Sequence, residues 1–488
     1  MIFFFLIGAL TSKPYAFTIR PWELQNIETV DVFDSLCSNI RVEYKNSDII
    51  RVLPINNEFI NEEWISDKTR FGYDSLKRWR FIYPMFKKNQ MFYQTSWSNL
   101  FAFLKKKIKI DNYNHIIIKT GPFSDIETLI SVEYLSNKNN KIILNNESNI
   151  NFDLVNYFLN VKKLKKNKIY LFIGNNLRLE NPLLNVQFKK LNKNKTILIA
   201  YIGVKCDINL KMFHLGTNLK VLKNILEGKH YFIKMIKNFE KDKFNITKSF
   251  KEKIWIIFGK DFVNRININN VNKFLQNCNT NNFFFTFLTE SVGKINLLSL
   301  GIKNFKIFNK NKINLYYILG CENLKNFNYN DFIIFQGHHN DKIRKWSNVI
   351  LPTVTWIEKS SLYFNCFGFL QKSNFIFKYP YKTRLDWKII KMMGVIFDLN
   401  VLDLNSSFIY TRINELVPKF KNYIYNYNKS SKYIVKYIKK YSKNFYFVEE
   451  YPFNNYYPFY CFINSIERSS KTLSFVMLTL KKQSSNFY

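Results

Sequence analysis

The amino-acid sequence predicts an α/β protein in which a small antiparallel β module precedes domains built on parallel sheets. Residues 39–44 alternate apolar and polar side chains, as a half-buried strand does. Residues 45–48 are turn-forming types, and a second apolar run over 49–53 ends at Pro54. These features together predict a β-hairpin. Farther along, apolar runs alternate with segments of helical spacing, which indicates parallel sheets covered on both faces.

The first helix is predicted just after the hairpin. Ser66, Asp67 and Thr69 carry side-chain oxygens that can cap free backbone amides, so we expect a short helix there. Residues 99–107 have helical spacing and lead to the first strand of a parallel sheet. The strands expected for the parallel sheets are 115–118, 169–173, 196–202, 253–259, 313–320 and 332–335.

Helices are expected between these strands and after them. Residues 125–135 place apolar side chains at helical spacing, directly after a Gly121-Pro122 turn. Asp386 opens a further helix, and residues 406–441 have the pattern of helices with lysine-rich faces. The strand–glycine turns resemble phosphate-binding loops, but the sequence has neither GxGxxG nor GxxxxGK[ST]. We therefore expect tight turns rather than nucleotide sites.

Charge and length limit the class of protein. A chain of 488 residues predicts about three domains. The net charge of +37 raises the possibility of nucleic acid as a partner. However, the lysines are scattered among asparagine and isoleucine, and the enriched residue types have A/T-rich codons. A biased genome, such as a mitochondrial one, explains this composition, so we expect no nucleic acid partner.

The six cysteines of the chain are far apart in sequence, at positions 37, 206, 278, 321, 366 and 461. No two of them form a CxxC pair, whereas iron–sulfur and zinc sites usually include such close pairs. The sequence therefore predicts free thiols in a reducing compartment and no metal site. Residues 1–10 are apolar but too short to cross a bilayer, which needs about 20 residues. We expect no membrane span.

Several segments resemble one known family. Residues 8–17 have the sequence GALTSKPYAF, and residues 60–71 have the sequence INEEWISDKTRF. Residues 336–339 are QGHH, and residues 356–361 are WIEKSS. On these segments the chain is similar to the large iron–sulfur subunit of mitochondrial respiratory complex I, NADH:ubiquinone oxidoreductase. The similarity is to the carboxyl-terminal, molybdopterin-oxidoreductase-like part of that subunit.

The resemblance implies Rossmann-like parallel-sheet domains of the molybdopterin oxidoreductase type, without a cofactor. In the family a cluster ligand precedes the Gly8 segment by two residues, where Leu6 stands here. We therefore expect the second half of a split subunit, with iron–sulfur clusters in a separate cysteine-rich partner. The expected domains are a junction remnant at 1–14, a β-rich module at 15–86, α/β domains at 87–250 and 251–400, and a mainly helical region at 401–488. The sequence leaves open whether the two α/β domains are interleaved.

The candidate cofactor residues argue against bound molybdopterin. Where the family pattern has a glutamate and an arginine, this chain has Phe367 and Phe369. Anionic pterin phosphates need donors and cations, which phenylalanine does not supply. His338 and His339 are adjacent, and neighbouring side chains on a strand end are expected on opposite faces, so we expect no shared metal ion.

The functional residues we expect are therefore those of a partner interface. Phe4, Phe5 and Leu6 form an apolar start, and Arg20 and Trp22 are residue types that dominate interface energetics. No catalytic, cofactor-binding or metal-binding residue is expected in the chain. The resemblance implies a structural, non-catalytic subunit of the matrix arm of complex I, in contact with other subunits of that arm. It also implies location at the matrix side of the mitochondrial inner membrane and mitochondrial encoding.

Two alternatives belong to other classes. One is a stand-alone molybdopterin oxidoreductase, and the other is a basic nucleic-acid-binding protein. The first requires a cofactor pocket with cationic and N–H donors. The second requires binding to DNA that survives physiological salt.

Overall fold

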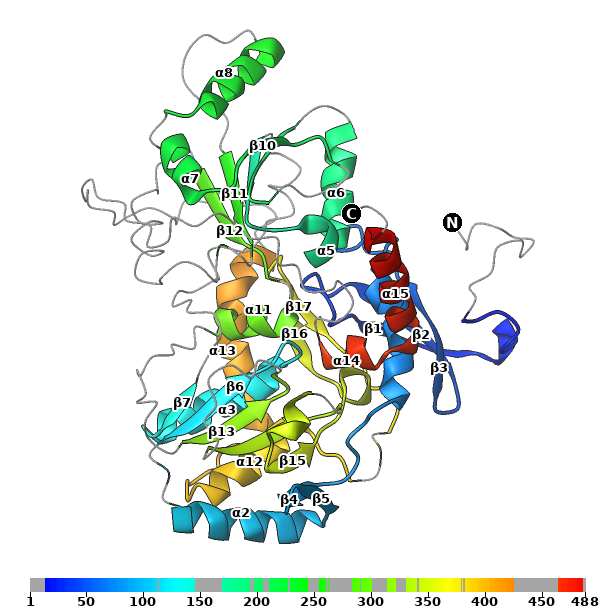
Figure 1. Cartoon of the computed structure of the whole chain (residues 1–488), viewed down its shortest axis with the longest axis vertical. Helices are drawn as coiled ribbons and strands as arrows, with labels where there is room; N and C mark the ends of the chain where they lie inside the picture. Colours follow the sequence, from blue (N-terminus) through cyan, green and yellow to red (C-terminus); the bar gives the residue numbers. More distant parts are fainter. Residues whose placement is uncertain are drawn as a thin grey trace.

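A computed structural model gives the fold of the chain. Among the residues that the structure describes, the strands form four sheets: two small antiparallel sheets, one parallel sheet and one mostly parallel sheet, with helices around them (Figure 1). The structure describes residues 14–111, 113, 115–144, 169–193, 197–204, 210–226, 229–244, 254–259, 262, 283–289, 291–300, 314–321, 331–339, 342–378, 380, 382–424 and 464–485.

The largest sheet has seven strands in the order β5-β4-β15-β14-β13-β6-β7. The five strands from β15 to β7 are parallel, and β4 and β5 join as an antiparallel hairpin at one edge. The strands are β4 (Met85–Lys88), β5 (Met91–Gln94), β6 (Ile116–Thr120), β7 (Ile142–Leu144), β13 (Leu315–Leu319), β14 (Phe332–Gly337) and β15 (Val349–Pro352).

The central strands of this sheet are buried on both faces because helices cover them. Every residue of β13 and β14 is buried, as expected for the continuous apolar runs seen in the sequence. Helices α3 (Ile126–Lys138) and α12 (Asp386–Ile396) pack against each other on one face, and α2 (Trp97–Asp111) packs against α12 (Figure 1).

The second parallel sheet has five strands in the order β10-β9-β8-β11-β12, with its own buried core. In Figure 1 it forms the upper part of the molecule, together with α5, α6, α7 and α8. Its elements are β8 (Ile169–Ile173), β9 (Leu198–Ile202), β10 (Phe213–Gly216), β11 (Ile254–Phe258), β12 (Phe283–Phe287), α5 (Leu177–Glu180), α6 (Pro182–Lys193), α7 (Leu219–Leu226) and α8 (Tyr231–Phe244).

The chain passes from one sheet to the other and back. Strands of the seven-stranded sheet come from residues 85–144 and again from 315–352, and the five strands of the second sheet lie between these two parts. The expected α/β fold with an antiparallel module and parallel sheets is confirmed. The domain boundaries given above remain predictions.

The antiparallel module consists of β1 (Gln25–Val30), β2 (Asn39–Lys45) and β3 (Asp48–Pro54). The hairpin predicted from the sequence is formed by β2 and β3. Asn46 occupies its turn with a φ of 56°, a left-handed conformation that asparagine tolerates. Glu43 is a buried residue of β2, and it pairs with Arg41 and Arg51, which neutralise its charge.

The predicted short helix after the hairpin is α1 (Asp67–Phe71), and the Ser66 hydroxyl caps it by accepting from the Thr69 N–H at 3.3 Å. The 3-10 segment η3 (Gly72–Lys77) follows. The carboxyl-terminal helices α14 (Ser465–Ser469) and α15 (Lys471–Ser485) pack on η3, so the last described helices contact the segment that follows the antiparallel module (Figure 1).

The remaining elements connect the sheets. A two-stranded ribbon of β16 (Leu362–Phe364) and β17 (Leu370–Lys372) packs against α11 (Val292–Ser299) and against α3. Helix α13 (Ser406–Ile424) also packs on α3. The other short elements are η2 (Pro21–Glu23), η5 (Lys342–Lys345) and η6 (Trp356–Glu358). Within the described residues, no helix has both the length and the apolar character that a bilayer crossing requires.

Candidate functional site

The predicted partner interface is partly visible. Phe4, Phe5 and Leu6 lie outside the described residues. Arg20 and Trp22 lie in and beside η2, where no residue is buried. The Trp22 side chain is 79% exposed, and the Arg20 guanidinium lies 5.9 Å from its ring centre. The structure thus brings these two side chains together on the surface.

The segment that carries them is attached to the antiparallel module by its polar side chains. The Lys45 ammonium contacts the Glu23 carboxylate at 2.7 Å, and Arg51 lies 4.4 Å from the centre of the Tyr15 ring. Phe17 is fully exposed nearby and has a φ of 61°. The sequence analysis did not single out Phe17. It is a further exposed aromatic side chain in the segment that precedes Trp22.

A second group of residues lies buried at the carboxyl ends of the seven-stranded sheet. The Lys359 ammonium contacts the carboxylates of Asp125 and Asp386, the latter at 2.8 Å. Lys359 is 8% exposed. Burial disfavours its charge, but the two carboxylates outweigh that effect and raise the Lys359 pKa well above its usual value. Lys359 is therefore a buried cation that joins two elements far apart in sequence.

Each carboxylate has a second role. Asp125 caps α3, because its carboxylate accepts from the Thr128 N–H at 2.7 Å. Asp386 accepts from the Gln336 side-chain amide at 3.0 Å, and the Tyr317 hydroxyl donates to the oxygen of the same amide. The cluster therefore ties α3, α12 and the ends of the central strands together.

Glu127 lies beside this cluster and is itself buried. Both of its carboxylate oxygens accept from the Leu362 N–H, at 3.0 and 3.1 Å. Burial, and next the charge of Asp125, raise the Glu127 pKa to about 8. Glu127 is consequently protonated near neutral pH, while Asp125 stays paired with Lys359.

A second buried ion pair holds the residues that follow β15. The Arg80 guanidinium donates two hydrogen bonds to the Glu358 carboxylate, at 3.0 and 2.8 Å. Glu358 also completes a capping box with Thr355 at the start of η6. The arrangement is bidentate and buried, so it fixes the backbone from which Lys359 extends.

The two histidines at the end of β14 lie closer together than predicted. Their Nδ1 atoms are 2.5 Å apart, and His339 Nε2 contacts the Ser75 carbonyl at 3.0 Å. Side chains on opposite faces were expected, and this was wrong because His338 follows the end of the strand, where the alternation stops. Burial, and next the Arg80 charge, lower the His339 pKa to about 3, so its ring is neutral. No group of three or more ligand-type side chains within the described residues could hold a metal ion.

The glycines at the strand ends have packing roles. A Cβ added at Gly121 would lie 2.2 Å from the Gly320 carbonyl oxygen, and Gly320 has a φ of 60°. The turns after β6 and β13 therefore touch backbone to backbone. This agrees with the expectation of tight turns at these positions.

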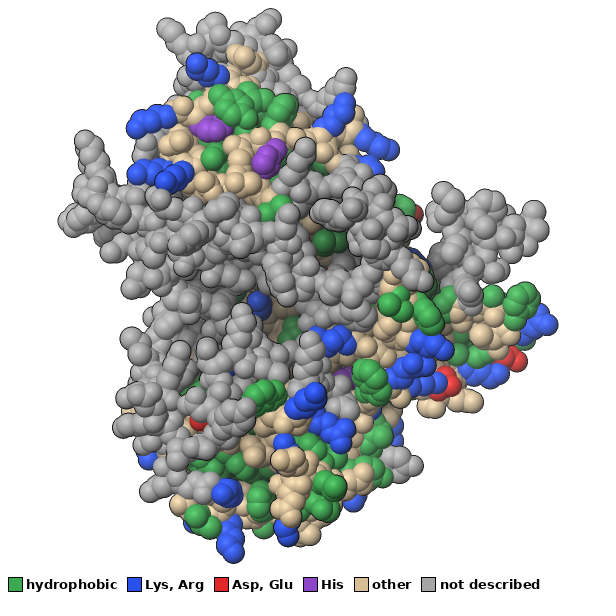
Figure 2. Space-filling view, in the orientation of Figure 1, with side chains coloured by type: hydrophobic (Ala, Val, Ile, Leu, Met, Phe, Trp, Pro, Cys, Tyr) green, Lys and Arg blue, Asp and Glu red, His purple; other side chains and the backbone are tan. Residues whose placement is uncertain are grey.

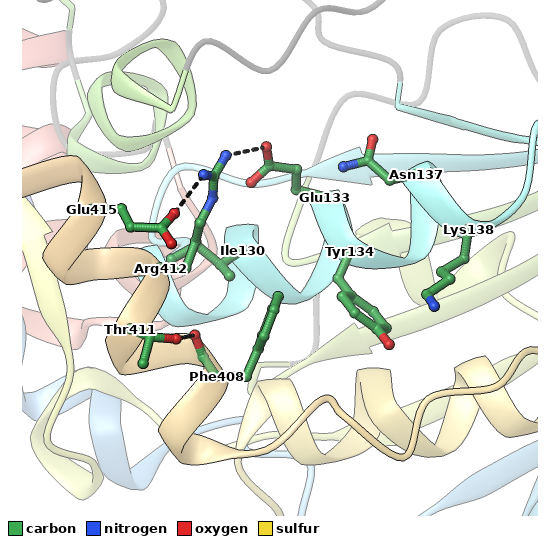
Figure 3. A pocket seen from close by; sticks show the side chains of 9 residues that line it. All are labelled: Ile130, Glu133, Tyr134, Asn137, Lys138, Phe408, Thr411, Arg412 and Glu415. Atoms are coloured by element: carbon green, nitrogen blue, oxygen red, sulfur yellow. Dashed lines mark hydrogen bonds and ion pairs between the residues drawn. The ribbon is translucent and has the colours of Figure 1, made fainter.

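A cavity of about 70 Å³ lies next to Lys359, lined by the carboxylates of Asp125, Glu127 and Asp386 among others. A larger cavity of about 350 Å³ lies between α3 and α13 (Figure 3). There Arg412 bridges Glu133 and Glu415, and the Tyr134 and Phe408 rings meet edge to face. The larger cavity thus carries an ion-pair cluster of one arginine and two glutamates on its wall.

The loop from β1 to β2 carries Cys37 in a buried position. Its backbone is joined to a distant turn, since the Cys366 N–H donates to the Ser35 carbonyl at 2.8 Å. Burial, and next the charges of Asp34 and Asp31, raise the Cys37 pKa well above its usual value. Cys37 is thus a buried cysteine beside two carboxylates.

Comparison with known families identifies the class of protein. The model of the molybdopterin oxidoreductase family matches residues 80–394. A second model, the 4Fe-4S domain of the NADH-ubiquinone oxidoreductase NDSU1/NuoG-like kind, matches residues 24–74. The chain belongs to the molybdopterin oxidoreductase family.

Curated relatives identify the branch of this family. The chain is 32% identical over 446 residues to the NADH-ubiquinone oxidoreductase 75 kDa subunit of Reclinomonas americana, covering 84% of this chain and 63% of that protein. It is 32% identical over 500 residues to the 75 kDa subunit of Acanthamoeba castellanii, covering 99% and 70%. For the NADH dehydrogenase [ubiquinone] iron-sulfur protein 1, mitochondrial, of Solanum tuberosum, the identity is 30% over 84% of this chain and 56% of that protein. The predicted resemblance to the complex I subunit is confirmed.

One prediction needs correction. The expectation that no iron–sulfur cofactor belongs to this chain is contradicted by the 4Fe-4S domain match at residues 24–74. That expectation rested on the wide spacing of the cysteines and on Leu6 at a position where the family has a cluster ligand. Cys37 is the single cysteine in the matched range, and a [4Fe–4S] cluster takes several thiolates. The residues of this range alone therefore do not supply all the ligands that a [4Fe–4S] cluster needs.

The cavity at the strand ends can be compared with the size and donor groups that a molybdopterin cofactor, implied by the family, would need. Ligand pockets of cofactor size are about 300–1,000 Å³ and offer donors to anionic groups. The cavity at the strand ends here is about 70 Å³ and has three carboxylates in its wall. Phe367 is buried in the main hydrophobic core, and its ring centre lies 6.4 Å from that of the half-buried Phe369. The described residues there do not fit a pterin cofactor.

Proposed function

We propose that this chain is a structural, non-catalytic subunit of the matrix arm of mitochondrial complex I, supporting electron transfer from NADH to ubiquinone. The observation that carries the proposal is the match to 75 kDa subunits over 84% and 99% of the chain. The chain spans 63% and 70% of the length of those two relatives. Its location would be the matrix side of the inner membrane, and its gene would be mitochondrial.

The proposed partners are a cysteine-rich chain that carries iron–sulfur clusters and other subunits of the matrix arm. The relative from Solanum tuberosum is itself named an iron-sulfur protein, which supports a setting of this kind. In that setting the chain would shield the clusters from water, because burial and hydrogen bonds set cluster potentials. The buried ion pairs around Lys359 and Arg80 would give the chain the rigidity that this role needs.

The proposed contact with the cysteine-rich chain runs through Phe4, Phe5, Leu6, Arg20 and Trp22. Support comes from the exposed pair of Arg20 and Trp22, since large aromatic and arginine side chains contribute most to interface energy. Phe17 would extend the same contact.

Native gel electrophoresis of mitochondrial membranes, followed by mass spectrometry, tests the proposal as a whole. The chain should co-migrate with the NADH-oxidising assembly and with subunits of its matrix arm. Its absence from that band, with the chain present elsewhere on the gel, would overturn the proposed function.

Trp22→Ala tests the interface. The exposed ring contributes little to folding, so the free energy of unfolding should change by less than about 0.5 kcal/mol. Loss of an interface anchor costs about 2 kcal/mol or more, so the variant should dissociate from the assembly at least about tenfold more readily. Deletion of residues 1–7 should act in the same direction.

The matched control for Trp22→Ala is Trp79→Ala, which also removes an exposed tryptophan, on a different part of the surface. It should leave co-migration on the native gel unchanged. Equal co-migration of the Trp22 variant and the wild-type chain would show that the interface is wrongly placed.

A further inference from the structure

A second surface differs in character from the Trp22 region. It is formed by the β4–β5 hairpin and the neighbouring face of α2, at the lower end of the molecule in Figure 1. We call it the hairpin surface and define it by Lys88, Met91, Tyr93, Phe103, Lys106 and Ile110. All six side chains are exposed, Met91 by 68% and Ile110 by 66%.

Strand β5 is an edge of the seven-stranded sheet and pairs only with β4 in the described structure. In an antiparallel pair, alternate residues direct their N–H and C=O groups away from the partner strand. Strand β5 therefore presents backbone groups that another strand can pair with. Its sequence, MFYQ, carries no proline, lysine or charge to discourage such pairing.

The hairpin is held rigidly in position for a partner. Asn89 and Gln90 both have positive φ, of 48° and 63°, which matches the tight turn that suits the twist of a hairpin. The Phe86 ring lies 6.1 Å from Tyr93 and 5.5 Å from Phe103, measured between ring centres. These ring contacts join β4 to β5 and to α2, so aromatic side chains form part of the hairpin surface.

The charge of this region has one sign. Residues 85–110, which include β4, β5 and most of α2, contain six lysines and no aspartate or glutamate. Residues 342–357, which include η5, also lack acidic residues, and Arg344 lies 5.3 Å from the centre of the Phe92 ring. Figure 2 shows blue basic atoms beside green apolar ones over this end of the molecule. Lysines scattered among acids would indicate only a solvated surface, whereas the sequence of residues 85–110 has lysines and no acids.

We propose that the hairpin surface binds an acidic, extended segment of a partner protein, which adds to the sheet as a strand beside β5. Backbone pairing would supply affinity, the exposed apolar side chains would contact alternate residues of the segment, and the lysines would select carboxylates. A protein fits better than a lipid surface or a nucleic acid, because neither of those offers N–H and C=O groups at strand spacing. The inference goes beyond the proposed function, which concerns the Trp22 region.

Fluorescence anisotropy of a labelled peptide, titrated with the full chain, tests the proposal. The probe alternates valine and glutamate over about ten residues, the length of a long strand. At about 0.15 M salt it should bind, and a matched peptide of valine and lysine should not. Lys88→Glu with Lys106→Glu should weaken binding by about tenfold or more.

Two further variants make the test specific. Lys189→Glu with Lys193→Glu changes the same charge on exposed positions of α6 and should alter binding by less than about twofold. Gln94→Pro removes an edge N–H with little change in charge and should weaken binding by about fivefold or more. If the double glutamate variant fails to fold, Lys88→Gln with Lys106→Gln replaces it.

Three results would overturn the inference. The first is equal loss of binding in the α6 control, which would indicate net charge alone. The second is unchanged binding by Gln94→Pro, which would exclude strand addition. The third is tighter binding of anionic phosphatidylglycerol vesicles or duplex DNA than of the acidic peptide, with the same sensitivity to Lys88 and Lys106.

Discussion

Helix α3 is contacted by two cations that differ in burial. At its start Lys359 lies between Asp125 and Asp386, and all three side chains are largely inaccessible to water. In its second half Arg412 lies between Glu133 and Glu415, where the Arg412 side chain is 38% exposed (Figure 3). The two clusters have the same composition, one cation and two carboxylates.

The difference shows that burial, and not the number of ion pairs, decides what a cluster does. Water screens the Arg412 cluster, and exposed pairs contribute about 0–1 kcal/mol each. The Lys359 cluster has no such screening. Removing one partner from it leaves charge stranded in a medium of low dielectric constant, which costs about 3–5 kcal/mol. Separating α3, α12 and the sheet would break the buried cluster, so the cluster holds these elements in one arrangement.

Lys359→Met should give the largest effect. The methionine approximates the lysine stem but leaves Asp125 and Asp386 buried without their cation, so the free energy of unfolding should fall by about 3–5 kcal/mol. Urea denaturation followed by circular dichroism measures this fall. Lys189→Met, at an exposed position of α6, is the control and should change stability by less than about 0.5 kcal/mol.

A compensating change checks the cause. Adding Asp386→Asn to Lys359→Met removes one of the stranded charges and should recover part of the lost stability. If Lys359→Met costs under about 1 kcal/mol, the cluster does not hold these elements in one arrangement.

Local patterns in the sequence were enough to predict the main elements. The hairpin of β2 and β3, the strands β6, β8, β13 and β14, and the helices α3 and α12 all follow from apolar periodicity and turn chemistry. Such patterns can be read from a few neighbouring residues, because the local backbone geometry depends mainly on them. The expected partner residues Arg20 and Trp22 were placed by residue type and resemblance, and the structure leaves them exposed.

The buried cluster could not be predicted, because its members come from three distant segments. Nothing near Lys359 in the sequence indicates a partner at Asp125. The parallel sheet brings them together, since the carboxyl ends of its strands meet at one edge. The approach of His338 and His339 was missed for a related reason: β14 ends at Gly337, before both residues, and the alternation of side chains along a strand no longer applies.

The iron–sulfur domain shows a different limit. The expectation of no cluster rested on the cysteine spacing and on Leu6, and residues 24–74 contain Cys37 as their single cysteine. The family model nevertheless matches the whole of residues 24–74. A chain can therefore match the family model of a domain even where it has few of the cysteines that would bind the domain's cluster.

Glu127→Gln should give an intermediate effect that depends on pH. The folded state raises the Glu127 pKa to about 8, above the ordinary value of 4.5, so between these pH values the folded chain holds a proton that the unfolded chain has lost. Its contribution to stability is present below pH 4.5 and is lost as pH rises towards 8. Glutamine stays neutral, so the variant should gain stability relative to wild type by on the order of 2 kcal/mol between pH 5 and pH 8.

Urea unfolding at several pH values measures this gain. The glutamine oxygen can still accept from the Leu362 N–H, so the hydrogen bond is kept while the titration is removed. Glu415→Gln, at an exposed position, is the control and should show no comparable pH dependence. A wild-type stability that rises between pH 5 and pH 8 because of Glu127 would contradict the assigned direction of the pKa shift.

Arg412→Met should give the smallest effect, although Arg412 contacts as many carboxylates as Lys359 does. Both of its partners reach solvent, so water replaces the lost ion pairs and the free energy of unfolding should fall by less than about 1 kcal/mol. The remaining loss should shrink at about 1 M salt, where the screening length is only about 3 Å, whereas the loss caused by Lys359→Met should persist because salt does not reach the buried cluster. Urea denaturation at low and high salt measures both.

Because the methionine also borders the cavity between α3 and α13, Arg412→Lys serves as the matched variant that keeps the charge and loses the forked geometry. A loss above about 2 kcal/mol that is insensitive to salt would place Arg412 in the same class as Lys359 and would refute burial as the property that separates the two clusters.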